Sequence, residues 1–173
     1  TCLHDNPFQC LLVLTAQRVQ QLLLRYGTRA TLVADLIMQG DDHPLISLPG
    51  YSTREIIFLC REEHVRRLTD VLFRRTAIAM EGALTPTAIA EVVGRLLRAL
   101  GEHAQVFSIT HQPQVAARGH HHLRVEKRVR DGSTHSGVAT LSRQERVEEI
   151  ARMSGGLTIT PETLRHAETL LAE

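Results

Sequence analysis

A chain of 173 residues is long enough for one ordinary domain or two small ones, and 43% hydrophobic with 23% charged residues is a globular composition. Aromatic residues make up only 3% and tryptophan is absent, so the core must consist mainly of aliphatic side chains. Twenty basic against nineteen acidic residues give a formal charge of +1, which argues against nucleic-acid binding through overall charge alone. The composition favours a helix-rich α+β protein.

The cysteines and the amino-terminal apolar run indicate in which cellular compartment the protein is expected. Cys2, Cys10 and Cys60 are odd in number and lack CxxC spacing, which argues against a disulfide framework or a structural zinc site. The apolar run at 10–16 is too short to span a bilayer, and no basic segment precedes it. We therefore expect a cytoplasmic protein without a signal peptide or membrane span, in which residues 1–18 form an unassigned leader.

The first half of the chain has a helical pattern. Apolar residues recur at intervals of three and four over 17–39, which predicts two helices or one helix bent at Gly27. Turn-forming residues predict a loop over 40–50. Ser-Thr-Arg-Glu at 52–55 has capping-box spacing and predicts a helix that runs to about Met80.

A further helix and then a change of pattern follow. Thr85-Pro86 is a helix start signal, and the apolar spacing behind it continues to Gly101. The β-prone run 105–110 predicts a short buried strand. This change of periodicity indicates a domain boundary, with a helical domain at 19–101 and a mixed domain at 102–173.

The remaining residues predict a hairpin and two helices. Alternating segments at 123–129 and 134–141 surround the turn-forming sequence Arg-Asp-Gly-Ser at 130–133, which is typical of a β-hairpin. A capping box predicts a helix over 143–153, and a proline start signal predicts another over 161–172.

The second half carries a long and specific run of residues. Ile-Thr-His-Gln-Pro-Gln-Val-Ala-Ala-Arg-Gly occupies 109–119, and His-His-Leu-Arg-Val-Glu-Lys follows at 121–127. With the segments at 148–156 and 166–172, this run resembles the carboxy-terminal end of the RecN family over about residues 104–173. RecN is similar to structural-maintenance-of-chromosomes proteins, with an ABC-type ATPase head split by a coiled coil, and acts in DNA double-strand-break repair.

The resemblance to RecN implies roles that this chain cannot fill alone. His111 matches the switch histidine that senses the γ-phosphate, and a completed head would bind ATP and Mg²⁺. The phosphate-binding sequence GxxxxGK[ST] is absent from the 173 residues, and the signature and Walker B motifs cannot be found. The resemblance therefore implies a noncatalytic segment whose partner is the missing part of the head and whose contact with DNA is indirect.

The first half resembles a different family. Segments at 25–30, 51–57, 59–63 and 70–76 are similar to the helical carboxy-terminal domain of FAD-dependent glycerol-3-phosphate dehydrogenase, over about residues 19–100. That family binds flavin in a separate upstream domain, whose GxGxxG sequence is not present here. FAD and an FAD-binding domain are the cofactor and partner that this resemblance implies.

Three functional hypotheses follow. The first is an incomplete, noncatalytic segment of a RecN-like repair ATPase. The second is an accessory domain of a glycerol-3-phosphate dehydrogenase with an appended tail, and the third is a structural chimera with no function of its own. A natural fusion, an engineered chimera and an assembly error all remain open, and surfaces selected for absent partners predict a homo-oligomer.

Two histidine features invite functional hypotheses. His111 follows the predicted strand at 105–110, where a side chain can face a ligand; a polar residue that only ends the strand is the competing interpretation. The run at 120–122 suggests metal binding, but consecutive residues on a strand point to opposite faces, so three histidines cannot meet one ion. We expect no metal site and interpret the run as a solvated strand.

Two groups of basic residues are candidates for phosphate binding. The first lies among acidic residues, which favours an ordinary charged helix surface. The second lies on the predicted hairpin, where alternate residues share a face and can contact a nucleic-acid backbone, although a charged edge strand is the competing interpretation. The first group is Arg66, Arg67, Arg74 and Arg75, and the second is Arg124, Lys127, Arg128 and Arg130.

Overall fold

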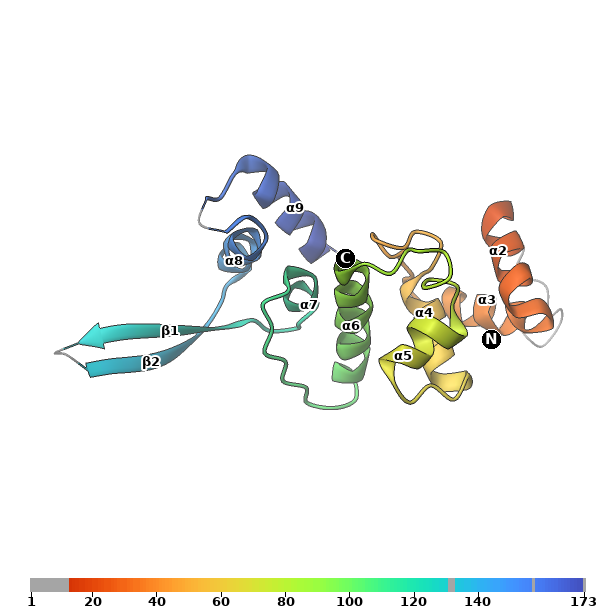
Figure 1. Ribbon diagram of the computed structural model, residues 1–173, viewed down its shortest axis with the longest axis horizontal. Helices are drawn as coiled ribbons and strands as arrows, with labels where there is room; N and C mark the ends of the chain where they lie inside the picture. The colour runs from red at the N-terminus through yellow and green to blue at the C-terminus, as the bar shows by residue number, and fades with distance from the viewer. Residues whose placement is uncertain (1–12, 131–132, 157, 173) are drawn as a thin grey trace. The chain divides into compact units, whose positions relative to one another are not determined.

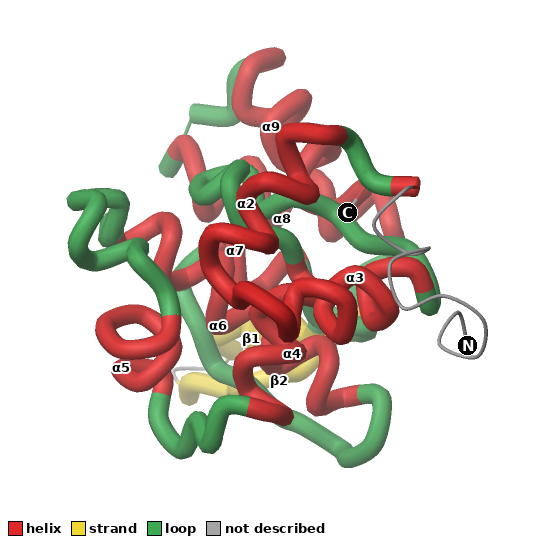
Figure 2. The backbone as a smooth tube through the Cα atoms, turned by 90° about the vertical axis from the view of Figure 1, so that its right-hand side faces the viewer, coloured by secondary structure: helices red, strands yellow, loops and turns green. Residues whose placement is uncertain are grey.

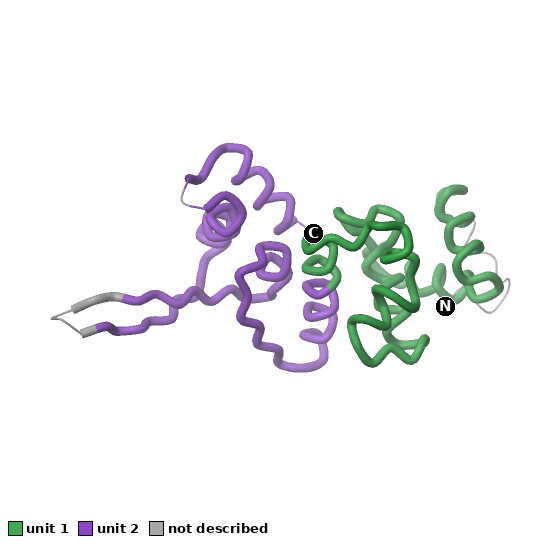
Figure 3. The backbone as a smooth tube through the Cα atoms, viewed as in Figure 1, with its two compact units in different colours: residues 1–92 green, residues 93–173 purple. Residues whose placement is uncertain are grey.

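The computed structural model describes residues 13–130, 133–156 and 158–172. It is helix-rich, with a two-stranded antiparallel sheet, which confirms the α+β prediction (Figure 1). The chain divides into two compact units, Thr1–Val92 and Val93–Glu173 (Figure 3). The predicted domain boundary after residue 101 stays a prediction. Across the described ranges, no helix is long and apolar enough to cross a membrane.

The first unit begins with a helix that bends as predicted. Helix α2 (Ala16–Tyr26) is followed by the 3₁₀ turn η2 (Gly27–Arg29) and by α3 (Ala30–Met38). Gly27 has a φ of 54°, a left-handed conformation that glycine adopts without steric cost. The Gly27 amide donates to Leu23 O and ends α2, so the bend is confirmed.

The third helix of this unit begins as predicted but ends early. Helix α4 (Thr53–Glu62) starts with the Ser52 hydroxyl accepting from the Glu55 amide at 3.4 Å. It stops at Glu62, so the predicted continuation to about Met80 is wrong. His64 has a φ of 52°, and a left-handed residue cannot continue a right-handed helix.

A second helical stretch replaces the predicted continuation. The Asp70 carboxylate accepts from the amides of Arg66 and Arg67 at 3.1 and 3.0 Å, which starts the short helix α5 (Leu68–Asp70). A π-helical stretch, η3 (Val71–Arg75), follows directly. Asp70 therefore satisfies the free amides of a new helix start, an arrangement that the apolar spacing does not show.

The predicted loop at 40–50 is held by the surrounding elements. A Leu45–Tyr51 backbone hydrogen bond of 2.9 Å closes it. The buried Glu91 carboxylate accepts from the amides of Ile46 and Ser47 at 2.7 and 2.8 Å. Helix α6 (Pro86–Gly101), which carries Glu91, begins with Thr85 accepting from an amide, as its start signal predicted.

The described residues of the second unit form the end of α6, three further helices and the hairpin. Helix α7 (Pro113–Ala117) precedes strands β1 (Leu123–Arg130) and β2 (Ser133–Thr140), which pair antiparallel as predicted. Residues 131–132 of the predicted turn lie outside the described residues. Helices α8 (Arg143–Gly155) and α9 (Pro161–Ala172) follow, and both predicted helices are confirmed. Figure 2 shows the hairpin as the yellow segment.

The core of the second unit lies between α7, α8 and α9. These helices contribute small and branched apolar side chains, and α8 is fixed at its start by the predicted capping box between Ser142 and Glu145. The buried residues are Ala117, Val147, Ile150, Ala151, Ala167 and Leu170.

A predicted strand is absent at 105–110. This segment has no strand partner within the described ranges, and it carries two apolar side chains in solvent: Phe107 is 77% exposed and Ile109 is fully exposed. The prediction of a buried strand is therefore wrong for this chain. A β-prone sequence forms a strand only where a neighbouring strand accepts its hydrogen bonds.

Helix α6 approaches α7 closely within the second unit. A Cβ atom placed on Gly94 would lie 2.9 Å from Gln114 O and 3.2 Å from Val115 Cα. Backbone atoms cannot move aside as a flexible side chain can, so the contact requires glycine. Gly94 therefore fixes how near the two helices lie.

Candidate functional site

His111 lies on a turn between the extended segment and α7. Its side chain is exposed, and its ring nitrogen lies 3.5 Å from Nε2 of Gln112. The Gln112 amide donates to the Thr110 hydroxyl at 3.0 Å, which shapes the turn, and Pro113 then starts α7. The imidazole is therefore held at a helix start with its ring open to solvent.

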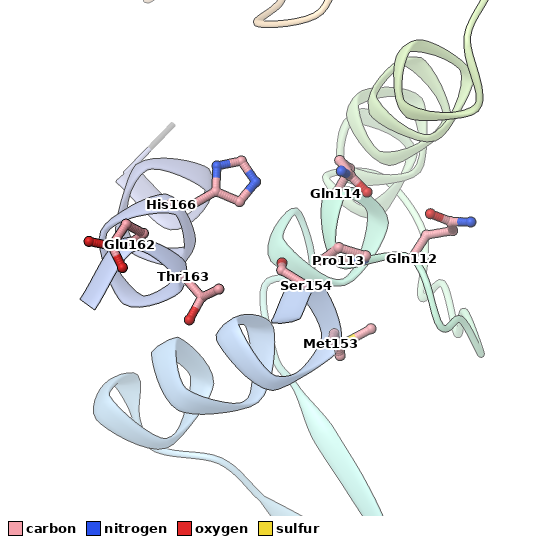
Figure 4. A pocket seen from close by; sticks show the side chains of 8 residues that line it. All are labelled: Gln112, Pro113, Gln114, Met153, Ser154, Glu162, Thr163 and His166. Atoms are coloured by element: carbon pink, nitrogen blue, oxygen red, sulfur yellow. The ribbon is translucent and has the colours of Figure 1, made fainter. Parts of the chain in front are cut away.

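A cleft of about 500 Å³ lies directly after this turn. Figure 4 shows α9 contributing Thr163 and His166 on one side, with the Gln112–Gln114 turn and Ser154 of α8 on the other. The Gln114 side-chain oxygen is buried and has no hydrogen-bond donor within the described residues. The remaining lining residues are Pro113, Met153 and Glu162.

The cleft has the chemistry of a polar binding surface. Its lining provides amide, hydroxyl and imidazole groups, which can donate to or accept from a ligand. Over the described ranges, no group of three histidine, cysteine, aspartate or glutamate residues is placed to hold a metal ion. The arrangement can orient a polar ligand, but His111 is not among the residues that line the cleft, and a phosphate-binding loop is absent from the sequence.

The three consecutive histidines do not lie on a strand, contrary to the sequence interpretation. His120 and His121 occupy a bend before β1, and His122 precedes the first strand residue. The Leu141 amide donates to His122 O at 2.9 Å, which extends the hairpin contact by one backbone bond. Burial, followed by the positive charge of Arg146, lowers the pKa of the His122 ring.

The basic residues of the hairpin have different surroundings. Arg124 pairs with Glu126 on its own strand, and its guanidinium lies 3.9 Å from Glu149 of α8. Lys127 is exposed and has the opposite strand parity to Arg124. The side chains of Arg128 and Arg130 lie outside the described residues. A nucleic-acid role for this group stays a prediction.

Glu149 is the acidic centre beside this hairpin. A hydrogen bond from Arg152 holds the pKa of its carboxyl below the usual range, and the charges of Arg152 and Arg124 add to the effect. Arg124 is therefore partly neutralised by Glu126 and Glu149.

The other basic group lies on the first unit. Arg66 and Arg67 are exposed, and Arg74 pairs with Asp70 at 3.3 Å in an i,i+4 arrangement. Arg75 lies 3.6 Å from Glu63. Two of the four arginines, Arg74 and Arg75, therefore form ion pairs with acidic neighbours, which is typical of an ordinary charged helix surface.

A buried carboxylate organises the first unit. Glu55 of α4 is fully buried and accepts from Arg18 at 2.7 Å, Arg25 at 3.0 Å and the Tyr26 hydroxyl at 2.7 Å. Arg25 also lies 3.7 Å above the Tyr51 ring. Burial, followed by the charge of Glu55, raises the pKa of Tyr26 far above its usual range. The network joins α2 to α4.

Part of this network has a sequence signal that the initial interpretation missed. Arg18 and Arg25 are seven residues apart, so a helix places both on one face. Glu55 was interpreted as a capping-box residue, but its carboxylate accepts from these arginines instead of the Ser52 amide.

A family model describing the C-terminal domain of alpha-glycerophosphate oxidase matches residues 8–106. The chain belongs to this family. The match includes the described helices of the first unit and the Glu55 network that joins α2 to α4. It begins at residue 8, inside the segment that the sequence analysis left unassigned, and it confirms the resemblance stated for about residues 19–100.

This member of the alpha-glycerophosphate oxidase C-terminal-domain family is also similar to proteins named DNA repair protein RecN. The chain is 56% identical over 86 residues to the protein of Xylella fastidiosa strain 9a5c, covering 50% of the chain and 15% of that protein. It is 44% identical over 102 residues to the Vibrio cholerae protein, covering 59% and 18%. It is 36% identical over 106 residues to the Bacillus subtilis protein, covering 61% and 18%.

The matches to RecN concern the carboxy-terminal region of those proteins, so the resemblance of the second half is also confirmed. The chain spans less than one fifth of the length of each of these three relatives. One polypeptide therefore combines a helical domain of the oxidase family with a RecN-like carboxy-terminal segment.

Proposed function

We propose that this chain carries the terminal segment of a RecN-type ATPase head behind a helical domain of the alpha-glycerophosphate oxidase family, with the junction after residue 101. In this proposal the chain does not hydrolyse ATP by itself. It contributes His111 to a nucleotide site whose phosphate-binding and magnesium-binding residues come from another segment, and its contact with DNA is indirect.

The observation that carries the proposal is the extended segment before His111. Phe107 and Ile109 are β-prone, apolar and exposed, a combination that is costly unless a neighbouring sheet covers them. The sequence there is compatible with a strand, and a strand partner is absent from the described residues. An incomplete sheet, to be completed by the rest of a head, accounts for both features.

The position of His111 supports a role that depends on such completion. Its ring is exposed at the end of the extended segment, and the next residue, Gln112, lines the polar cleft. A strand docked into a sheet would fix this ring at the strand end, where α/β proteins bind ligands. Alone, the imidazole has no phosphate to sense.

Complementation in trans tests this function. The chain is co-expressed with Xylella fastidiosa RecN truncated before the matching segment, and ATP hydrolysis by the purified complex is measured. We expect activity in the complex and none in either part. His111→Ala should lower kcat tenfold or more, about 1.4 kcal/mol in the barrier, with the complex intact.

The exposed residue His103 provides a matched control, because it lies in a turn away from the cleft. His103→Ala should leave kcat unchanged. A complex that hydrolyses ATP equally well with either alanine would show that His111 has no switch role. A folded chain that never restores activity to the truncated protein would contradict the proposal as a whole.

A second function is favoured by the family match over residues 8–106. The first unit would then serve as an accessory domain that binds an FAD-containing oxidoreductase domain. Mixing the chain with FAD alone should give no flavin spectrum in the protein fraction after gel filtration. Co-purification with a separately expressed flavin domain of an alpha-glycerophosphate oxidase would support this function over the first.

A further inference from the structure

A second pocket lies at the opposite end of α7 from His111. It has a volume of about 290 Å³, and Arg98 of α6 and Arg146 of α8 are among its lining residues. His120 and His121 line it from the bend before β1, and Gly119 lines it with its backbone. All of these residues belong to the second unit, and the lining contains no acidic residue.

Both arginines are held in place by backbone carbonyl groups. Arg98 donates to Arg118 O at 3.0 Å. Arg146 donates to Gly119 O at 2.7 Å, to Ala117 O at 3.3 Å and to His120 O at 3.4 Å. A guanidinium has five N–H donors, and carbonyl oxygens satisfy donors without cancelling the positive charge. The side chains are thus oriented but not neutralised.

The charges of this pair are unbalanced. In the part of the chain that the structure describes, neither Arg98 nor Arg146 forms an ion pair with a carboxylate. The Nε atom of Arg146 is buried without a hydrogen-bond acceptor in the same residues. Burial, followed by repulsion from Arg98, lowers the pKa of Arg146, so the two cations disfavour each other's charge.

We infer that the Arg98–Arg146 pocket binds a phosphate group. Two guanidinium groups match the geometry of phosphate oxygens and are weakly hydrated, so they bind phosphate more readily than compact ammonium groups do. The adjacent imidazoles could add donors. A water molecule occupies roughly 30 Å³ in the liquid, so the pocket has room for the anion and several waters.

This site is separate from the nucleotide role proposed for His111. The His111 turn precedes α7, whereas the phosphate pocket is built from the residues that follow it. The inference needs no missing segment, so it can succeed or fail independently of complementation by a truncated RecN. The phosphate group can belong to a free anion or to the end of a nucleic acid.

Titration of the full chain with inorganic phosphate tests the inference. Ionic strength is held constant with sodium chloride, and binding is measured by calorimetry and by the shift of the thermal midpoint. We expect saturable binding that Arg98→Gln weakens about tenfold. The matched control is Arg143→Gln, which removes the same charge from an exposed position of α8.

Arg146 needs a milder substitution because it also holds three carbonyl groups. Arg146→Lys keeps the charge but loses the planar pair of donors, and it should weaken phosphate binding with the circular dichroism spectrum unchanged. Equal weakening by Arg98→Gln and Arg143→Gln would overturn the inference, because the anion would then be responding to overall charge. Equal binding by wild type and Arg98→Gln would also overturn it, because Arg98 would then not hold the anion.

A second arm identifies the source of the phosphate. A short duplex with a 5′-phosphate is compared with the same duplex lacking it. Tighter binding of the phosphorylated duplex, lost in Arg98→Gln, assigns the pocket to a nucleic-acid end. Equal binding of both duplexes together with saturable inorganic phosphate assigns it to a free anion. Binding of neither inorganic phosphate nor the phosphorylated end overturns the inference.

Discussion

Two clusters of charged side chains, one in each unit, are arranged in opposite ways. In the first unit, the fully buried Glu55 receives donors from two arginines and a tyrosine, so opposite charges meet inside the fold. In the second unit, Arg98 and Arg146 meet carbonyl dipoles instead of a carboxylate. A balanced cluster holds elements together, whereas an unbalanced one attracts an ion from outside. The difference separates a structural network from a candidate binding site.

Of the changes considered, removing the charge of the Glu55 carboxylate should lower the free energy of unfolding most. Glu55→Gln leaves Arg18 and Arg25 with an uncompensated charge, and breaking a buried ion pair in this way costs about 3–5 kcal/mol. Urea unfolding followed by circular dichroism measures the loss. The exposed Glu62→Gln on the same helix is the control and should change little. Equal stabilities of the two variants would mean that the network does not hold α2 to α4.

Truncating a side chain in the apolar core of the second unit should lower the free energy of unfolding by a comparable or slightly smaller amount. Ile150 is fully buried between α7, α8 and α9, and Ile150→Ala should lower the free energy of unfolding by about 2–5 kcal/mol. If the units unfold independently, only the transition of the second unit should move. Differential scanning calorimetry separates the transitions, and a shift of both would show that the units unfold together.

Replacing the tyrosine of the Glu55 network should lower the free energy of unfolding moderately, and this loss should be smaller at high pH. Tyr26→Phe removes a donor to a buried carboxylate and should cost about 1–3 kcal/mol at neutral pH. The folded-state pKa of Tyr26 is raised, so its contribution is complete below the unfolded value of about 10 and falls as the pH rises above it. The free-energy difference between wild type and variant should therefore shrink above pH 10, as urea unfolding in a pH series can test.

Breaking an exposed ion pair of the second unit should have the smallest effect. Arg165 and Glu162 lie 3.2 Å apart, and both side chains are 72% exposed. Arg165→Gln should change the free energy of unfolding by less than about 0.5 kcal/mol, because water screens the pair. If the free energy of unfolding falls by more than about 1 kcal/mol in the same urea assay, this exposed ion pair stabilises the second unit despite screening by water.

Sequence signals predicted those elements whose ends are set by residues within or next to the element itself. The bend at Gly27, the starts of α6, α8 and α9, and the hairpin all follow from capping residues, prolines or alternation near the element itself. Two of the failures concern the helix expected to continue past Glu62 and the strand expected at 105–110. The apolar spacing does not reveal the left-handed conformation of His64, and a β-prone sequence alone does not supply the partner strand that 105–110 lacks within the described residues.

The candidate sites divide in the same way. His111 could be singled out because one contiguous run of residues resembles RecN. The phosphate pocket could not, because Arg98 and Arg146 are 48 positions apart and only the packing of α6 and α8 around α7 brings them together. Neither residue belongs to a basic run, so charge patterning along the sequence gives no signal for the pair.

The close contact at Gly94 limits which sequences can be joined to a RecN-like tail. Alanine in place of this glycine would push its Cβ against the backbone of α7, although alanine is ordinarily the better helix former by about 1 kcal/mol. Any recombined gene that retains α7 in its present position must therefore bring a glycine to the helix before it. In such fusions, helix propensity alone would favour alanine at this position, whereas the steric contact with α7 requires glycine.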